Sequence, residues 1–543
     1  MASGARAGVV ASAPSATASP VPAPETPSGI RTDRCVFAFL LLVAAFRLAY
    51  LWWVPVGLVG DEAYYWDWSR QLDWGYYSKP PMVAWLIAAA TAIGGHHPET
   101  IRTLAVVLTS ASLFFGYRLA RELFDPRTGA WFVAALALAP AALAQNLIFT
   151  IDAPLLFCWT AALWCFSRWL GAGERSSRQR WGIALALCLG AGLLTKQMMA
   201  VFPLLAALHL ATSPEHRHRL RQPGFWGIVS LGAVALVPLL VWNARHGWIM
   251  FHHTAHHFEG APFSWIDALG RVTEFVAGEV ALTGFVIGII AVFAAAAAVR
   301  RMLRGELSEA ERLLFWFSVP ALLLMTGMAL RQRINLNWPL VFLPPLILLA
   351  VHWSLPGAGG RRRLRIGHWL KAGVGVSATL TVIACTYPLT LQSLGLAGTK
   401  ADLTARLRGW ESLAGEVDST LSPLRERSAQ PVFVLTVGHR YVTSQLAFHL
   451  ADQPRVMRWP RAPGQIESQY EVWGGLEDRS GENALIVHQI DERQPALPLP
   501  TELRAAFAAV EPLRTVRIPL GGGRERRYEL HLGRHFAPAS HDD

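Results

Sequence analysis

Two adjacent carboxylates, Asp61 and Glu62, follow directly after a long apolar run that starts near Cys35. A run of that length can cross a bilayer, so both acids are expected near membrane level. Carboxylates are costly to bury at that depth and are usually functional where they occur. A positioned carboxylate can act as a general base that accepts the proton of an attacking hydroxyl. The alternative is a hydrated loop with an aromatic belt of Trp and Tyr, and the residues alone leave both interpretations open.

Lys79 stands immediately before two prolines, Pro80 and Pro81. Proline fixes its own backbone and disfavours a helical conformation in the residue before it, so Lys79 is expected at a rigid corner. A lysine held there is suited to binding a phosphate as a point charge. The alternative is a lysine that snorkels to the membrane interface.

Asp152 is the charged residue of a short turn between two apolar runs. Because Pro154 follows two residues later, Asp152 can serve as the N-cap of a helix. It can equally be a second acid that faces Asp61 across a site. These two interpretations are compatible.

Further cations and histidines lie on the same side of the expected membrane. Arg331 and Arg333, with Lys196, are expected to join Lys79 in a cationic ring that stabilises a phosphate. The segment from His252 to His257 contains four histidines, and His253 and His257 are spaced to share one helix face. A zinc site there lacks a nearby acidic or cysteine ligand, so contact with phosphate or sugar, through His256, is the preferred interpretation. A plain interfacial loop stays open.

The composition indicates a membrane protein. The chain has 543 residues, of which 52% are hydrophobic and 16% are charged, with a net charge of +11. Soluble domains carry about 25% charged residues. The basic residues form short runs between apolar stretches, which is typical of positive-inside topology and argues against a nucleic-acid partner. The five cysteines all lie in apolar stretches, without the spacing of a zinc site or a disulfide framework.

These patterns predict a polytopic α-helical membrane protein with about 11 spans, and about 13 as the upper count. The runs are 35–56, 101–120, 128–147, 152–170, 181–195, 197–212, 225–243, 276–299, 313–330, 336–354 and 367–390. The run 82–93 is too short to span and is expected to dip into the membrane or lie along it. Basic clusters predict which loops face the cytoplasm; they lie at 118–127, 175–180, 217–221, 300–304 and 361–365, with Arg31 and Arg34 near the start.

Three regions follow from this topology. Residues 1–30 are rich in Ala, Pro, Ser and Thr and are expected to be a disordered cytoplasmic leader. Residues 31–391 form the transmembrane part. Residues 392–543 alternate between helical and strand patterns, which predicts a small periplasmic α/β domain that covers or shapes the membrane site. Its expected helices are 402–417, 440–450 and 502–509, and its expected strands are 431–437, 484–489 and two near Val516 and Tyr528.

The chain resembles the GT-C superfamily of polyprenyl-phosphate-sugar transferases, in the branch of lipid A aminoarabinose transferases and protein O-mannosyltransferase relatives. The matching pieces lie between residue 35 and about residue 350: Asp61-Glu62, Tyr76, Lys79-Pro80-Pro81, Asp152, Leu194-Thr195-Lys196 and Asn337-Trp338-Pro339. The resemblance implies a bacterial inner-membrane enzyme that transfers a sugar from a polyprenyl-phosphate carrier to a lipid A-like or other periplasmic acceptor, such as a glycan. It also implies Asp61 as the catalytic carboxylate, Asp152 as its acidic helper, and Tyr65, Tyr76 and Lys79 as contacts of the carrier phosphate.

The sequence departs from the aminoarabinose transferases at two positions. They have a basic residue where this chain has Tyr64, and a metal-holding glutamate where this chain has Ser78. The resemblance therefore implies no certain cofactor, and it makes a divalent metal at this site doubtful. It does not identify the transferred sugar. A single in-line displacement with Asp61 as base would invert the anomeric centre. The alternatives are a proton-coupled transporter or lipid flippase, although no internal repeat is evident, and a membrane scaffold for the C-terminal domain.

Overall fold

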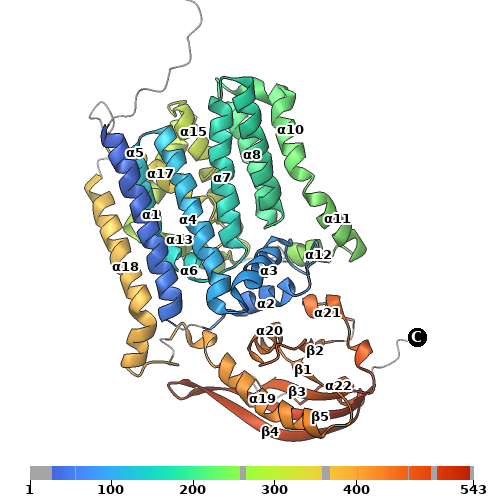
Figure 1. The fold of residues 1–543 in the computed structure, drawn as a ribbon. Helices are drawn as coiled ribbons and strands as arrows, with labels where there is room; N and C mark the ends of the chain where they lie inside the picture. Colours follow the sequence, from blue (N-terminus) through green and yellow to red (C-terminus); the bar gives the residue numbers. More distant parts are fainter. Residues whose placement is uncertain are drawn as a thin grey trace, which may run out of the picture.

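The computed structural model describes residues 27–54, 57–256, 264–356, 367–399, 402–462, 464–490 and 498–537. Figure 1 shows two parts: a tall bundle of helices, and below it a twisted sheet with its own helices. The short helices α2 (Gly60–Ser69), α3 (Met82–Gly94) and α12 (Ile249–His256) lie between the two parts. Most of the expected leader, the basic cluster at 361–365 and His257 fall outside the described residues.

The other helices of the bundle are α1 (Pro27–Trp53), α4 (Pro98–Leu123), α5 (Pro126–Ala137), α6 (Pro140–Leu147), α7 (Asp152–Gly171), α8 (Arg175–Leu193), α9 (Val201–Thr212), α10 (Pro223–Ala233), α11 (Leu236–Arg245), α13 (Trp265–Leu282), α14 (Val286–Leu303), α15 (Glu309–Trp316), α16 (Val319–Ala329), α17 (Leu343–Ser354) and α18 (Gly367–Ser393), with 3-10 turns η1 (Gln197–Ala200) and η2 (Arg217–Arg221). Five helices of the bundle begin at a proline, which favours the first helical position: α1, α4, α5, α6 and α10.

Several of the apolar runs are divided into shorter helices. Among the described residues, five helices are long and apolar enough to cross a membrane, or six if the bent pair α10 and α11 is counted as one. Prolines within or at the start of helices contribute to these breaks, because proline cannot continue a helical hydrogen-bond ladder. The structure is thus a polytopic helical membrane fold, while the expected count of about 11 spans stays a prediction. The helix α3 has 13 residues, which gives a length of about 20 Å, too short to cross the bilayer core.

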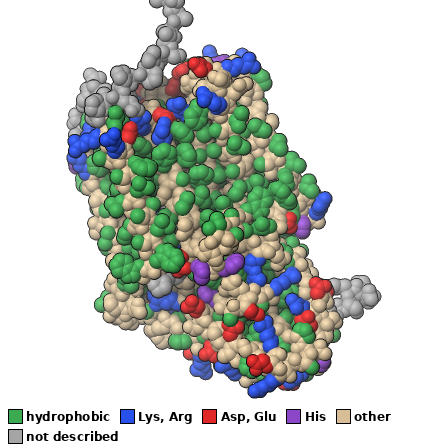
Figure 2. Space-filling model, in the orientation of Figure 1, with side chains coloured by type: hydrophobic (Ala, Val, Ile, Leu, Met, Phe, Trp, Pro, Cys, Tyr) green, Lys and Arg blue, Asp and Glu red, His purple; other side chains and the backbone are tan. Residues whose placement is uncertain are grey.

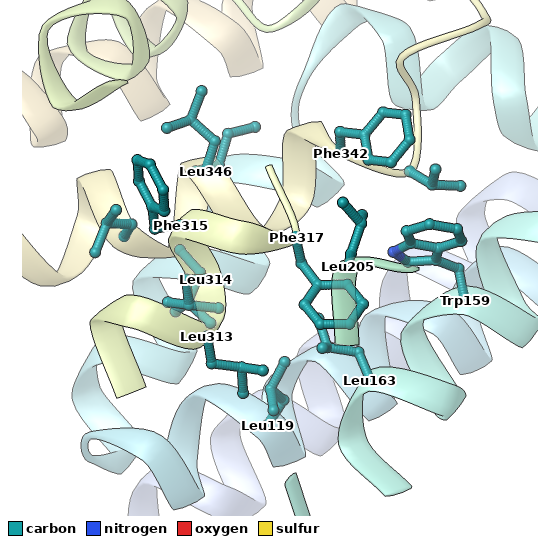
Figure 3. Close-up of a cluster of buried hydrophobic side chains, with 14 of the residues drawn as sticks. Leu119, Trp159, Leu163, Leu205, Leu313, Leu314, Phe315, Phe317, Phe342 and Leu346 are labelled. Atoms are coloured by element: carbon teal, nitrogen blue, oxygen red, sulfur yellow. The ribbon is translucent and has the colours of Figure 1, made fainter. Parts of the chain in front are cut away.

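The bundle interior is held together by apolar side chains from α4, α7, α9, α15 and α17. Figure 3 shows Trp159, Phe317 and Phe342 meeting at its centre. The rings of Trp159 and Phe342 are 5.3 Å apart and meet edge to face, which is a favoured geometry for aromatic pairs. On the face shown in Figure 2, hydrophobic side chains spread over most of the bundle between its two ends.

The two ends of the bundle differ in chemistry. At one end, Arg121 on α4 pairs with Asp33 on α1, and Arg168 on α7 pairs with Glu122. At the other end, α7 begins with Asp152. The helix α4 has 26 residues, so its two ends are about 39 Å apart. Figure 2 shows Lys and Arg side chains gathered at the end far from the sheet.

The C-terminal part is a five-stranded sheet with strand order β2-β1-β3-β5-β4. The strand β1 pairs in parallel with β2 and β3, and β5 pairs antiparallel with β3 and β4. The elements are α19 (Trp410–Arg427), β1 (Val432–Val437), α20 (Arg440–His449), β2 (Met457–Arg458), α21 (Gln469–Trp473), β3 (Asn483–Ile490), α22 (Thr501–Ala505), β4 (Phe507–Gly521) and β5 (Arg524–Phe536). One face of the sheet shares a hydrophobic core with α19, α20, α2 and α3.

The C-terminal part contains most of the helices and strands that the sequence predicts, with shifted ends. The strands β1 and β3 lie within one residue of the ranges 431–437 and 484–489. The helix α19 starts at Trp410, eight residues after the expected start, and α22 ends at Ala505 because the chain enters β4 at Phe507. The short elements β2 and α21 carry too little periodicity to be predicted from sequence.

Candidate active site

Asp61 lies in the first turn of α2, and two residues of the C-terminal part contact it. The Tyr441 hydroxyl donates a hydrogen bond to Asp61 Oδ1 at 3.0 Å. Arg440 Nη2 lies 3.8 Å from the same oxygen. Both residues begin α20, directly after β1. Asp61 stays partly open, with 38% of its side chain exposed. A partly open carboxylate can meet a substrate hydroxyl, as a general base requires.

Gly60 permits this close approach of α20 to α2. A Cβ atom at Gly60 would lie 2.3 Å from the ring of Tyr441. That distance is far inside van der Waals contact, so any side chain here would displace Tyr441. Behind this contact, Gln445 Nε2 donates a hydrogen bond to the carbonyl of Leu58 at 2.7 Å. The helix α2 is therefore fixed to α20 at its first turn.

Glu62 is fully buried, and its carboxylate is occupied by structural contacts. It forms an ion pair with Arg102 on α4, at 2.7 Å. It also accepts hydrogen bonds from the backbone N–H groups of Val59 at 2.9 Å and Phe149 at 2.8 Å. These donors satisfy the buried oxygens of the carboxylate. Glu62 therefore joins α2, α4 and the turn before Asp152, and its geometry fits a positioning role beside the catalytic role expected from sequence.

Asp152 is held between two polar side chains. Its Oδ1 accepts a hydrogen bond from Lys196 Nζ at 2.8 Å, in an ion pair that is largely buried. Its Oδ2 accepts one from Asn337 Nδ2 at 2.7 Å. Both carboxylate oxygens of Asp152 thus accept hydrogen bonds. The ion pair with Asp152 fixes the position of the Lys196 ammonium. The stretches 194–196 and 337–339, far apart in sequence, meet here.

Lys79 lies in the same charged cluster. The N–H of Met82 donates a hydrogen bond to the carbonyl of Leu194 at 3.0 Å, which brings the loop of Lys79 beside that of Lys196. Burial, together with the charge of Lys196, lowers the pKa of Lys79 to about 8, while Asp61 and Asp152 act in the opposite direction. Burial disfavours the charged form of Lys79, and an anion beside it stabilises that form. The binding of an anion at this place is therefore favourable.

Tyr65 belongs to this cluster and Tyr76 does not. Tyr65 stands one turn after Asp61 on α2, and burial with the charges of Asp61 and Asp152 raises its pKa well above the ordinary value, so its hydroxyl stays protonated. A protonated hydroxyl can donate to a phosphate. Tyr76 is buried against Trp68, with stacked rings 4.6 Å apart, and its hydroxyl bonds to backbone groups of the same loop. Tyr76 therefore shapes the loop that carries Lys79.

Three other predicted residues have different surroundings. Arg333 pairs with Glu274 on α13, and three quarters of its side chain is exposed. Arg331 is exposed at the end of the turn after α16. His256 is the last described residue of α12, and its side chain lies outside the described part. The expected roles of these residues in phosphate binding stay predictions.

A polar pocket of about 520 Å³ opens beside Arg440. Residues of both parts line it, among them Tyr77, His252, His253, His439 and Arg461. The ring of Tyr77 packs on that of His253, 4.7 Å between centroids. Burial and the neighbouring arginines lower the pKa of His439 to about 4, so this ring is neutral at pH 7. The pocket can accept a polar group that lies next to Asp61.

A metal ion does not fit the residues around Ser78. In the described part of the chain, three potential ligand atoms converge at a single place, in the sheet, away from Ser78. Ser78 itself is buried and offers a hydroxyl where the aminoarabinose transferases have a carboxylate. No step of the chemistry below passes through a metal.

Sequence reasoning missed Arg440 and Tyr441, because the C-terminal part seemed to lack a catalytic motif. A usable signal was present. Both residues follow the carboxyl end of the strand predicted at 431–437, which is parallel to its neighbours in the structure. Ligands commonly bind at such ends of parallel strands. The complete cluster joins one open carboxylate, Asp61, to three cations: Lys79, Lys196 and Arg440. It can hold an anion next to a base.

Comparisons with known proteins support the resemblance seen in the sequence. Residues 78–242 match the family described as dolichyl-phosphate-mannose-protein mannosyltransferase. The solved structure of ArnT from Cupriavidus metallidurans superimposes with a TM-score of 0.59 at 14% identity, over 93% of this chain and 98% of that one. The chain has the GT-C fold. The resemblance seen in the sequence is thereby confirmed.

The curated relatives of this chain are named as sugar transferases. A lipid A galacturonosyltransferase, RgtD of Rhizobium johnstonii, is 34% identical over 299 residues, which are 54% of this chain and 60% of that protein. An undecaprenyl phosphate-aminoarabinose arabinosyl transferase of Pseudomonas aeruginosa is 31% identical over 250 residues, 40% of this chain and 44% of that protein. The chain thus spans less than two thirds of the length of these relatives. A second ArnT structure with the same fold, TM-score 0.56 at 15% identity over 93% of this chain and 98% of that one, is bound to undecaprenyl phosphate.

Proposed function

We propose that this protein transfers a sugar from a polyprenyl-phosphate carrier to a lipid A-like acceptor, with Asp61 as the general base. The observation that carries the proposal is the cluster itself. A half-open carboxylate lies among Lys79, Lys196 and Arg440 at one end of a hydrophobic bundle. A lipid-linked phosphate fits this cluster in two ways. Its phosphate is an anion that the three cations can bind, and its lipid chain can lie in the bilayer beside the bundle.

The chemistry assigns a role to each group. The ammonium groups of Lys79 and Lys196 stabilise the departing phosphate without proton transfer. Tyr65 donates a hydrogen bond to it, and Asp152 holds Lys196 in position. Asp61 accepts the proton of the acceptor hydroxyl while that oxygen attacks the anomeric carbon from the side opposite the phosphate. One displacement of this kind inverts the anomeric configuration.

The topology is part of the same proposal. We place the basic end of the bundle in the cytoplasm, because arginines of α4, α7, η2 and α15 gather there. The site and the C-terminal region 392–543 then lie on the periplasmic side of a bacterial inner membrane. Residues 31–391 form the transmembrane part, with about 11 crossings when short helices join across their breaks.

The relatives support a sugar on the lipid A class of acceptor, and their names include both a uronate and an aminosugar. Mass spectrometry of membrane lipids and surface glycans distinguishes these. Wild-type cells, a gene deletion and a strain with Asp61→Asn are compared. We expect a sugar-sized increment on the acceptor in the wild type and its loss in both other strains. An increment that persists in the Asp61→Asn strain, at wild-type amount, refutes Asp61 as the base.

A further inference from the structure

A second chemical site lies in the C-terminal sheet, on two neighbouring antiparallel strands. His488 on β3 is paired in register with Glu529 on β5, and His531 follows two residues after Glu529. Residues two apart on a strand point to the same face. The three side chains therefore meet on one face, with one ligand atom from each lying within 4.8 Å of the others.

One buried ring nitrogen of each histidine faces the carboxylate of Glu529. His488 Nδ1 and His531 Nε2 are buried and have no hydrogen-bond partner among the described residues. They face the Glu529 carboxylate at 3.8 Å and 3.4 Å respectively. His488 is 5% exposed and His531 is 8% exposed. Buried polar atoms are nearly always satisfied, so two such nitrogens aimed at one carboxylate require an explanation.

We propose that His488, Glu529 and His531 bind a divalent transition-metal ion, of which Zn²⁺ is the best fit. Two imidazole nitrogens and a carboxylate form a ligand set that zinc accepts, with bonds of about 2.0–2.2 Å. Ligand atoms on a tetrahedral ion are then about 3.3–3.6 Å apart. The spacing of 3.4 Å between His531 and Glu529 already matches. His488 lies 3.8 Å from Glu529 and within 4.8 Å of His531, so its ring has to move closer when the ion binds.

The ion would satisfy both orphaned nitrogens at once. Glu529 remains 38% exposed, so a fourth ligand such as water can reach the metal from solvent. Arg504 on α22 is a positive charge near His531 and opposes the ion, which argues for moderate affinity. No part of this site belongs to the cluster around Asp61.

The position of the site in the sheet gives it a structural effect. His488 is paired in register with Val437, the last residue of β1. Arg440 and Tyr441, which contact Asp61, come three and four residues after Val437. A metal that joins β3 to β5 would therefore stiffen the sheet next to the loop that supplies these two contacts.

The test uses the full-length protein in detergent, purified with a tag that contains no histidine and then stripped of metal with a chelator. Zn²⁺ is titrated by calorimetry, and Co²⁺ is added to record its visible absorption. We expect the wild type to bind Zn²⁺ with an affinity at least tenfold higher than the His488→Ala and His531→Ala variants. His535→Ala is the matched control, because its exposed ring also lies on β5, and it should bind like the wild type.

Folding of the variants is checked by thermal unfolding with and without Zn²⁺. The wild type and His535→Ala should unfold at a higher temperature when Zn²⁺ is present, whereas Glu529→Gln, which keeps the size of the side chain, should show a reduced shift. Equal Zn²⁺ affinity and equal thermal shift in the wild type and the three ligand variants would overturn the proposal.

Discussion

The hydroxyl of Tyr441 lies 3.0 Å from Oδ1 of Asp61, across 380 positions of the chain. Because Asp61 is the proposed base, this contact orients it toward the substrate. Tyr441→Phe removes one hydrogen bond to a charged group, worth about 1.5–3 kcal/mol, so we expect a loss of about tenfold or more in kcat. Transfer rates with a purified lipid-linked donor measure it.

Tyr528→Phe is the control for that variant. The Tyr528 hydroxyl is also buried, but it has no hydrogen-bond partner among the described residues. Its removal should leave the rate unchanged. If Tyr441→Phe is as active as Tyr528→Phe, the C-terminal part does not orient Asp61.

The low pKa of Lys79 predicts pH-dependent donor binding. With a pKa of about 8 in the free protein, Lys79 is charged below that pH and neutral above it. Only the charged form attracts phosphate, so affinity for undecaprenyl phosphate should fall as the pH rises through about 8. A binding titration between pH 6 and pH 10 tests this.

Two variants identify Lys79 as the cause. Lys79→Arg keeps its charge throughout this range, because the guanidinium does not deprotonate there, and should abolish the fall. Lys79→Met should bind weakly at every pH. A fall near the same pH in Lys79→Met would assign the titration to another group.

The pair of Asp152 and Lys196 should behave as one unit. Asp152→Asn leaves the Lys196 ammonium without its counter-ion, and Lys196→Met leaves the buried carboxylate unpaired. Each change alone should lower donor affinity, and the double variant should lose less than the sum, with a coupling of about 0.5–3 kcal/mol. Additive losses would separate the two residues.

Glu62 should be more important for stability than for chemistry. Glu62→Gln breaks the buried pair with Arg102 and should cost about 3–5 kcal/mol of unfolding free energy. Glu416→Gln breaks the exposed pair with Arg514, of similar length at 2.8 Å, and should cost about 0–1 kcal/mol. Unfolding of both variants in detergent gives the comparison. Similar costs would mean that Glu62 is not a structural anchor.

The sequence predicts those residues of the site that stand beside a long apolar run. Asp61, Lys79 and Asp152 stand out because a charge beside a long apolar run is unusual. Periodicity and composition do not show which polar groups are already paired inside the fold. The sequence therefore predicts the same kind of site role for Glu62 as for Asp61, and for Tyr76 as for Tyr65. Their difference depends on Arg102 and Trp68, contacts that only tertiary packing creates.

The position of Arg440 and Tyr441 after a strand was visible in the sequence, but their contact with Asp61 was not. Their importance comes from the docking of α20 on α2, which Gly60 permits. The sequence around Gly60 does not indicate that the ring of Tyr441 packs against it. The helical ranges were easier to predict than their grouping into spans, since prolines break several apolar runs without changing their hydropathy.

The contact between α2 and α20 also sets an order of events during synthesis. The ribosome makes Asp61 early, and its partners Arg440 and Tyr441 emerge only after the whole helical bundle has been made. A nascent chain therefore holds its carboxylate without the groups that orient it. If Asp61 is the base that we propose, competence for transfer arrives last, when the sheet has folded and docked, because an unfinished chain lacks the two residues that contact this carboxylate.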